Sequence, residues 1–149
     1  MSYYTVHTPI EGKPEIASLY EKIHPGMIHQ NAHYAAMHET LDENVGRLLQ
    51  KLEDEGIEDN TVVILTSDNG GFINKYQEQV VTSNTPLRSG KGSLYEGGIR
   101  VPLIIYFPGV TQEGSQSDQS VHTADFYPTI LELVGLDGNK VLKQLKDRR

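Results

Sequence analysis

The chain has 149 residues, of which 37% are hydrophobic and 22% charged, which is enough for one domain with a core. Its formal net charge of −7 argues against nucleic acid or an anionic membrane as the main partner, because both need a basic surface. No cysteine is present, which excludes disulfides, cysteine-bound zinc and a nucleophile derived from cysteine.

The first part of the chain is broken by prolines until a long helical pattern begins. Residues 3–6 predict a short strand that delivers His7 to a loop, and residues 15–22 predict a short helix. From residue 31 to residue 55, apolar residues recur every three or four positions, which predicts an amphipathic helix that stops at Gly56. The apolar stripe consists of Tyr34, Met37, Leu41, Val45, Leu48 and Leu52.

Two apolar runs predict buried strands with a long loop between them. Residues 61–66 are β-branched and apolar, which predicts a buried central strand in a parallel arrangement. Residues 101–107 predict a second buried strand, and this run is too short to span a bilayer. Residues 72–100 show little periodicity, so we expect a long structured loop of the kind that is either functional or disordered.

The end of the chain predicts one more helix and a tail. Thr123 or Asp125 is expected to cap the helix, with Pro128 in its first turn and Gly135 just past its end. The charged residues 137–149 are expected to fray. The order helix, strand, loop, strand, helix predicts α/β layers.

Asp68 and Asn69 directly follow the first predicted strand. In open α/β sheets, ligands bind at the carboxyl ends of the strands. Carboxylate and amide oxygens are also the ligands that calcium and magnesium prefer. On this local pattern alone, an ordinary Asp-Asn-Gly turn without a metal is the more common case.

Lys91 lies between two glycines, so its ammonium group can approach an oxyanion such as sulfate or phosphate closely. Two familiar phosphate loops do not fit. A P-loop would need glycine in place of Thr85 and serine or threonine in place of Gly92, and a dinucleotide-binding fingerprint would need glycine in place of Tyr95. A flexible surface loop is the simpler explanation of the glycine pattern by itself.

His7 is the third candidate. It stands next to a turn that Pro9 fixes, and a rigidly held imidazole suits general acid catalysis near neutral pH. His122 precedes the last helix and is a minor candidate for lining a pocket. Four other histidines are expected to be surface or helix-packing residues: His24, His29, His33 and His38.

These candidate sites occur in an order that resembles the sulfatase family. The resemblance rests on residues 60–71, which read Asn-Thr-Val-Val-Ile-Leu-Thr-Ser-Asp-Asn-Gly-Gly, and on residues 85–102. The second segment reads Thr-Pro-Leu-Arg-Ser-Gly-Lys-Gly-Ser-Leu-Tyr-Glu-Gly-Gly-Ile-Arg-Val-Pro and is the most specific. Residues 34–46, 125–131 and 7–10 support it, so that the match extends over residues 3–136.

The resemblance implies a partial alkaline-phosphatase-like (sulfatase) α/β fold, with a mainly parallel sheet flanked by helices and its N-terminal strands missing. It also implies hydrolysis of sulfate esters. Asp68 and Asn69 would bind calcium, with magnesium as the alternative. Lys91 would contact the sulfate, and His7 would contact the sulfate and act as the acid for the leaving group. Arg88 is a further candidate, for holding a substrate sugar.

The chain also departs from the family pattern. No serine here begins the Cys/Ser-x-Pro/Ala-Ser-Arg motif whose first residue the family converts to formylglycine. No Asp-Asp pair is present to supply further calcium ligands. We therefore expect residues 1–136 to be part of a catalytic domain that is inactive as an isolated chain.

Two explanations of these departures compete. The chain is either a truncated product or incomplete gene of a sulfatase, or a separate small protein that kept the scaffold and lost the reaction. We favour truncation, because a sheet that lacks its first strands exposes an unpaired edge, and such an edge invites homo-oligomerisation or strand swapping. Two other functions stay open: a phosphodiesterase or phosphonate hydrolase of the same superfamily, and a non-catalytic domain that binds an anion or a partner.

The expected substrate of the intact enzyme is a sulfated small molecule or glycan. No signal peptide is visible at the N-terminus, and a periplasmic or secreted location is expected only for the intact parent.

Overall fold

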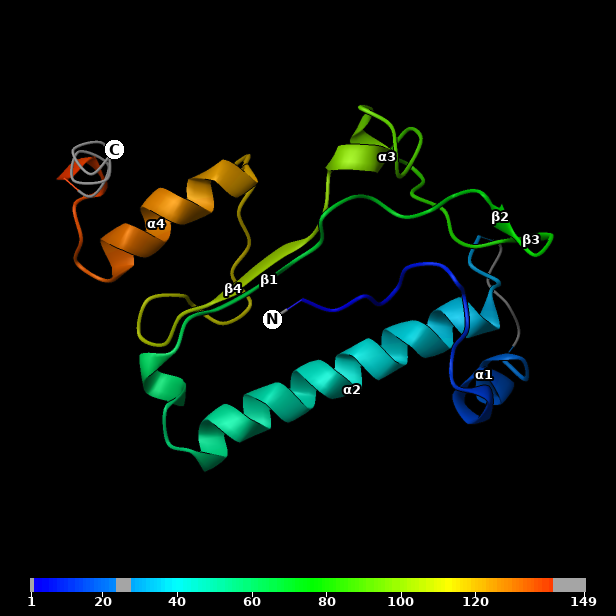
Figure 1. The fold of residues 1–149 in the computed structure, drawn as a ribbon, viewed down its shortest axis with the longest axis horizontal. Coiled ribbons are helices and arrows are strands. Elements are labelled where there is room, and N and C mark those ends of the chain that lie inside the picture. The colour runs from blue at the N-terminus through cyan, green and yellow to red at the C-terminus, as the bar shows by residue number, and fades with distance from the viewer. Residues whose placement is uncertain (1, 24–27, 141–149) are drawn as a thin grey trace, which may run out of the picture. The chain divides into compact units, whose positions relative to one another are not determined.

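This computed structural model describes residues 2–23 and 28–140 of the chain (Figure 1). The contacts of the chain group into two compact units, Met1–Gln112 and Glu113–Arg149, and each is described by itself. Most of the tail predicted to fray, residues 141–149, lies outside the described residues. Within the described ranges, no helix has both the length and the apolar character needed to cross a membrane.

Both helices predicted in the first part of the chain are present. Helix α1 spans Pro14–Tyr20, and helix α2 spans Ala32–Asp54. The side chain of Asn31 caps α2 by accepting a hydrogen bond of 2.9 Å from the backbone N–H of Tyr34. Past the C-terminal end of α2, Gly56 has a φ of 64°, which is the left-handed conformation that commonly ends a helix.

The buried core of this unit lies between α1 and α2. Ile16 and Ala17 of α1 are buried together with Ala36 of α2, and Tyr20 packs against them. Small side chains allow a close approach here: a Cβ atom on Gly12 would lie 2.6 Å from the Cβ atom of Ala36. The core contact of α2 is thus made by Ala36, which lies outside the predicted apolar stripe, and the residues of that stripe are only half-buried.

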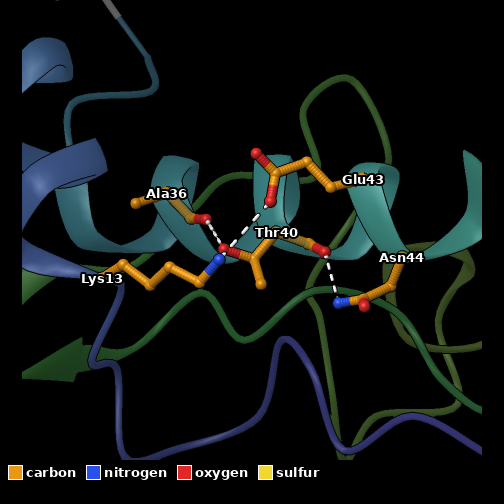
Figure 2. A network of polar contacts seen from close by, with 5 residues as sticks. All are labelled: Lys13, Ala36, Thr40, Glu43 and Asn44. Carbon is orange, nitrogen blue, oxygen red and sulfur yellow. Dashed lines mark hydrogen bonds and ion pairs between the residues drawn. The ribbon is translucent and has the colours of Figure 1, made fainter. Parts of the chain in front are cut away.

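Polar groups lie next to the same contact along α2 (Figure 2). Lys13 Nζ pairs with Glu43 Oε2 at 3.4 Å, and both side chains are about half exposed. Such an exposed pair contributes less than about 1 kcal/mol. Within α2, Thr40 Oγ1 donates to the carbonyl of Ala36 at 2.9 Å, and Asn44 Nδ2 donates to the carbonyl of Thr40 at 2.7 Å.

Both predicted strands form, but they pair antiparallel. Strand β1, Val63–Thr66, and strand β4, Leu103–Tyr106, make a two-stranded sheet. The last residue of β1, Thr66, pairs with the first residue of β4, Leu103. The prediction of a parallel neighbour is wrong for this pair, because the segment between the strands leaves and returns at the same end of the sheet.

The predicted burial of these strands is also wrong in part. The side chains of Leu65, Ile104 and Ile105 are 36%, 59% and 40% exposed. Among the described elements, neither α1 nor α2 packs against β1 or β4. The apolar sequence of the strands is thus that of a buried sheet, while the described residues leave much of it uncovered.

The segment between β1 and β4 is structured, as predicted. It contains a short hairpin of β2, Lys75–Tyr76, with β3, Gln79–Val80, and a single helical turn, α3, Glu96–Ile99. The hairpin was not predicted, because its turn residues Gln77 and Glu78 adopt positive φ angles of 48° and 65° that asparagine and glycine usually supply.

The second unit contains a 3-10 turn, η2, Thr123–Asp125, followed by helix α4, Phe126–Leu133. Asp125, one of the two predicted caps, occupies the N-cap position of α4, although its side chain forms no capping hydrogen bond with that helix. The 3-10 turn before it is capped by His122. His122 Nδ1 accepts a hydrogen bond of 3.1 Å from the N–H of Ala124, and the Asp125 carboxylate accepts one of 2.7 Å from the N–H of His122. An imidazole is rarely used as a cap, so the threonine and aspartate were the more obvious choices.

Candidate functional site

The first part of the site is the turn that follows β1. Ser67 Oγ donates to the carbonyl of Asn69 at 3.0 Å and closes this turn. The Asp68 side chain is exposed and that of Asn69 is half-buried. Neither side chain forms a hydrogen bond or ion pair with any residue that the structure describes, so their oxygen atoms are available to a ligand.

Glycines fix the segment after this turn. The N–H of Gly70 donates to the carbonyl of Gly98 at 2.9 Å. A Cβ atom on Gly70 would overlap the carbonyl oxygen of Gly97. Glycine is required at residue 70 because the two backbones touch, and the contact joins the end of β1 to α3, the helical turn that precedes β4 (Figure 1).

The loop that carries Lys91 joins the same place. The N–H of Lys91 donates to the carbonyl of Gly71 at 3.0 Å, and the N–H of Gly97 donates to the carbonyl of Arg88 at 2.9 Å. We call the backbone segments 70–71, 88–91 and 97–98 the glycine junction. The structure therefore brings two of the predicted site segments together: the Asp68–Asn69 turn and the Gly-Lys-Gly loop.

The two cationic side chains of this loop have different surroundings. The ammonium group of Lys91 is exposed and forms no ion pair within the described ranges of the chain. The guanidinium carbon of Arg88 lies 3.8 Å from the ring centroid of Tyr95, which is a cation–π contact. Lys91 is thus free to meet an anion, whereas Arg88 is already held by an aromatic ring.

His7 is held by its immediate neighbours. Its Nδ1 lies 2.8 Å from the carbonyl oxygen of Thr8, and its ring centroid lies 4.9 Å from that of Tyr4. Because a carbonyl only accepts hydrogen bonds, Nδ1 must carry the hydrogen, and Nε2 is left for another partner. In the described part of the chain, no direct contact joins His7 to Asp68 or Lys91.

The donor set for a cation is small. The described residues contain no group of three or more histidine, aspartate or glutamate side chains that could hold a metal ion. Asp68 and Asn69 offer a carboxylate and an amide oxygen, which suit a hard cation in kind. They supply few of the roughly 6 to 8 oxygen ligands that calcium takes.

The family model that matches this chain is that of the sulfatases, and it covers residues 1–136. The chain belongs to the sulfatase family. This sulfatase chain is 40% identical to a sulfatase from Formosa agariphila, over an alignment that covers 97% of the chain and 29% of that protein. It is 34% identical to arylsulfatase J from Mus musculus, over 89% of the chain and 21% of that protein.

Solved structures agree with the family. The crystal structure of Ps i-CgsB is 33% identical, has a TM-score of 0.78 and is matched over 91% of this chain and 28% of that chain. The same protein in complex with k-i-k-neocarrahexaose has a TM-score of 0.76. The predicted α/β, partial alkaline-phosphatase-like sulfatase fold is therefore confirmed, and the chain spans less than a third of the length of the proteins it matches.

One residue of this sulfatase site was missed by sequence reasoning. Asn84 Nδ2 lies within hydrogen-bonding distance of three backbone carbonyls of the glycine junction, those of Gly71, Ser89 and Gly97. In the sequence, Asn84 stands in a Ser-Asn-Thr-Pro stretch that is typical of a surface turn. No local signal distinguishes it from such a turn residue.

A cavity of about 360 Å³ lies elsewhere in the first unit and contains none of the predicted site residues. Burial raises the pKa of Tyr34 in its wall, and a hydrogen bond with Thr82 lowers that pKa in part. A hydrogen bond with Glu39 is the main cause that raises the pKa of Tyr20. Other lining residues include Ile23, His29, Ala32, His38 and Val81.

Proposed function

We propose that this chain supplies the cation-binding and sulfate-binding part of a sulfatase that hydrolyses sulfate esters. The observation that carries the proposal is the backbone hydrogen bond of 3.0 Å from Lys91 to Gly71. It places the backbone of the loop that carries Lys91 beside the segment that follows Asp68 and Asn69. A cation and a lysine in one place suit an oxyanion, because they neutralise its oxygens where charge develops.

Asp68 and Asn69 are proposed to bind calcium, with magnesium as the alternative. Their side chains are the right kind of donor and have no partner in the described structure that would compete. A bound divalent cation would supply positive charge to the sulfate oxygens. We expect the affinity of the isolated chain for calcium to be weak, because most ligands would be water.

Lys91 and His7 are proposed to act on the sulfate ester itself. Lys91 would bind the sulfate through its unpaired ammonium group. His7 would contact the sulfate and protonate the leaving oxygen through Nε2, since its Nδ1 is engaged by the carbonyl of Thr8. Arg88 would contact a substrate sugar, with its guanidinium placed by Tyr95.

The proposed substrate class is a sulfated glycan or a sulfated small molecule. Among the similar structures, Ps i-CgsB has been crystallised with an oligosaccharide, k-i-k-neocarrahexaose. We propose further that the isolated chain has negligible sulfatase turnover, since it contains no formylglycine-type motif. Release of 4-nitrophenol from 4-nitrophenyl sulfate that Lys91→Ala abolishes would overturn this last proposal.

The cation site is tested by calorimetric titration of the 149-residue chain with calcium chloride. We expect weak binding that Asp68→Ala removes and that Asp59→Ala, an exposed acid outside the site, leaves unchanged. The same titration with magnesium decides between the two ions. Binding that is unchanged in Asp68→Ala would refute the proposed ligand, and a sub-micromolar affinity would contradict the expected weakness.

The anion site is tested by titrating the ¹⁵N-labelled chain with sodium sulfate and following backbone amide shifts. We expect shifts at residues 90–92 that are lost in Lys91→Ala. Lys75→Ala is the matched control, because Lys75 is an exposed lysine of the same unit that pairs with Glu78. Stronger binding of phosphate than of sulfate would favour the phosphodiesterase or phosphonate hydrolase alternative.

We also propose that the β1–β4 sheet pairs with a second copy of the chain. Each strand of this two-stranded sheet has one outer edge, and its unpaired backbone groups can form hydrogen bonds with an identical edge. Edge pairing would also bring apolar side chains of the two copies side by side on the faces of the joined sheet, where Leu65, Ile104 and Ile105 are exposed.

A further inference from the structure

Asn84 lies at the centre of the glycine junction. Its side chain is part-buried, and Nδ2 donates to the carbonyl oxygens of Gly71 at 3.1 Å, Ser89 at 3.2 Å and Gly97 at 2.9 Å. An amide nitrogen has only two hydrogens, so three carbonyls share them. One uncharged side chain thus links three separate backbone segments.

The surrounding glycines form the space that this amide occupies. A Cβ atom on Gly71 would lie 2.7 Å from Asn84 Oδ1, and a Cβ atom on Gly90 would lie 2.9 Å from Asn84 Nδ2. A side chain at either position would therefore displace the amide. The close fit of backbone around one side chain is the geometry expected of a residue that sets positions rather than one that merely fills a turn.

Ser89 adds a second, independent observation. It has a φ of 67°, a left-handed conformation that is uncommon for residues other than glycine. Its carbonyl is one of the three that Asn84 holds, and Lys91 follows two residues later. The hydrogen bond from Asn84 therefore stabilises a strained backbone conformation that directs the chain into the Gly-Lys-Gly loop.

We infer that Asn84 is a positioning residue that fixes the Lys91 loop against the Asp68–Asn69 turn. The inference rests on the proposed function, because Lys91 and the Asp68–Asn69 turn are the groups proposed there to bind sulfate and a cation. The amide type is essential. A carboxylate would face three carbonyl oxygens without a hydrogen to donate, and alanine would leave those carbonyls with fewer donors.

The experiment measures amide hydrogen exchange by NMR in the full 149-residue chain. The reporters are the junction amides of Gly70, Lys91 and Gly97, which donate to Gly98, Gly71 and Arg88. In Asn84→Ala, we expect their protection factors to fall by at least about tenfold, which corresponds to the loss of about one buried hydrogen bond. The amide of Tyr34 at the start of α2 should keep its protection.

Two further variants separate positioning from general destabilisation. Asn84→Asp should lose protection when its carboxyl group is ionised and regain part of it at acid pH, where the neutral carboxyl group can donate one hydrogen bond. Asn44→Ala is the matched control: Asn44 Nδ2 also donates to a backbone carbonyl, at 2.7 Å, but within α2 (Figure 2). It should leave the junction amides unchanged.

Sulfate and calcium titrations of the same variants connect the result to the site. If the wild-type chain binds these ions, Asn84→Ala should weaken binding at least about tenfold, comparable with one lost hydrogen bond. Unchanged junction protection in Asn84→Ala, acid recovery that is absent in Asn84→Asp, or unchanged ion binding would each overturn the inference. If the wild-type chain binds neither ion, the proposed function fails, and the exchange data still decide whether Asn84 fixes the junction.

Discussion

The glycine junction and the β1–β4 sheet adjoin each other in the chain, but they are stabilised in opposite ways. In the sheet, the backbone is regular while the side chains of Ile104 and Ile105 are 59% and 40% exposed. In the junction, the backbone is irregular, yet Gly97 and Gly98 are buried and hydrogen-bonded to other segments, and Gly90 is buried. Regular secondary structure is therefore a poor guide to which part of this chain is self-contained.

The two regions therefore differ in whether they are stabilised by contacts within the region or need contacts from outside it. The junction satisfies its backbone groups internally, through glycine contacts and one asparagine amide. The sheet satisfies only the groups between its two strands, and its apolar surface needs a cover that α1 and α2 do not provide among the described elements. Substitutions should accordingly affect folding in the junction and association in the sheet.

The largest effect is expected for Gly97→Ala. The new Cβ atom would overlap the carbonyl oxygen of Ser89 and lie 2.6 Å from that of Arg88, and backbone atoms cannot move aside as a flexible side chain can. We expect a loss of about 3 kcal/mol in the free energy of unfolding, measured by urea denaturation. In the control Gly46→Ala, the new Cβ atom meets nothing within 4 Å. Because alanine favours a helix more than glycine does, the free energy of unfolding is expected to rise by about 0.5 to 1 kcal/mol.

A loss below about 1 kcal/mol in the free energy of unfolding of Gly97→Ala would show that the junction tolerates a side chain as well as a typical surface site does. That result would contradict the view that close backbone contacts stabilise the junction. The control matters because both residues are glycines in described helices, and only their surroundings differ.

Ile104→Lys tests the sheet. The side chain is already 59% exposed, so the free energy of unfolding should change by less than about 0.5 kcal/mol. Self-association, followed by sedimentation velocity over a range of concentrations, should weaken at least about tenfold, or about 1.4 kcal/mol. Ile57→Lys is the control, since Ile57 is 48% exposed but lies outside the sheet. A wild-type chain that stays monomeric at the highest concentration contradicts the proposed pairing.

A neighbouring pair of hydroxyl groups gives a finer comparison. Ser67 Oγ donates to the carbonyl of Asn69 at 3.0 Å in the half-buried turn, and Thr66 Oγ1 donates to that of Pro102 at 2.9 Å at the exposed end of the sheet. Ser67→Ala should cost about 1 kcal/mol, because it leaves a shielded carbonyl without its donor. Thr66→Val should cost less than about 0.5 kcal/mol, because water replaces the donor and valine favours strands. Equal losses in urea denaturation would remove the distinction between the two regions.

The sequence predicted regular elements better than it predicted their relations. The apolar stripe of α2 and the runs at 61–66 and 101–107 are local patterns, so their elements could be predicted. The direction of strand pairing could not be, because an apolar run carries no information on its neighbour. The burial of the strands was overestimated for a related reason, since composition shows what a strand would bury but not what covers it.

The candidate site shows the same division. Asp68, Asn69 and Lys91 were chosen from local chemistry and from the family resemblance, and the structure joins their segments through Gly71. The role of Asn84 could not be predicted, because it depends on the convergence of three carbonyls from residues 71, 89 and 97. The cap on η2 was missed for a different reason, since His122 is an unusual residue type at that position.

The smallest expected effect is a loss of stability at alkaline pH, and it arises from Tyr34, which lies outside both regions. Burial raises the pKa of Tyr34 above the ordinary tyrosine value of 10.0. Below pH 10.0, the folded and unfolded chains both keep this proton, and its contribution to stability is fully present. As the pH rises further, the unfolded chain ionises first, so the free energy of unfolding falls until the pH passes the raised pKa of the folded state.

Urea denaturation between about pH 8 and about pH 11 should therefore show a loss of stability in base that is smaller in Tyr34→Phe. Tyr127→Phe is the control, because Tyr127 is 49% exposed and lies in the other unit. Tyr20 contributes with the same sign, since its hydrogen bond with Glu39 also raises its pKa, so the loss should shrink in Tyr34→Phe without vanishing. A base-induced loss that is identical in wild type and Tyr34→Phe would show that the burial of this hydroxyl group has no influence on folding.

The same titration tests whether the two parts unfold together. If the exchange protection of the Lys91 amide fell over the same pH range as Tyr34 ionises, the helical core and the glycine junction would unfold as one cooperative unit. The junction would then be less self-contained than its internal hydrogen bonds indicate.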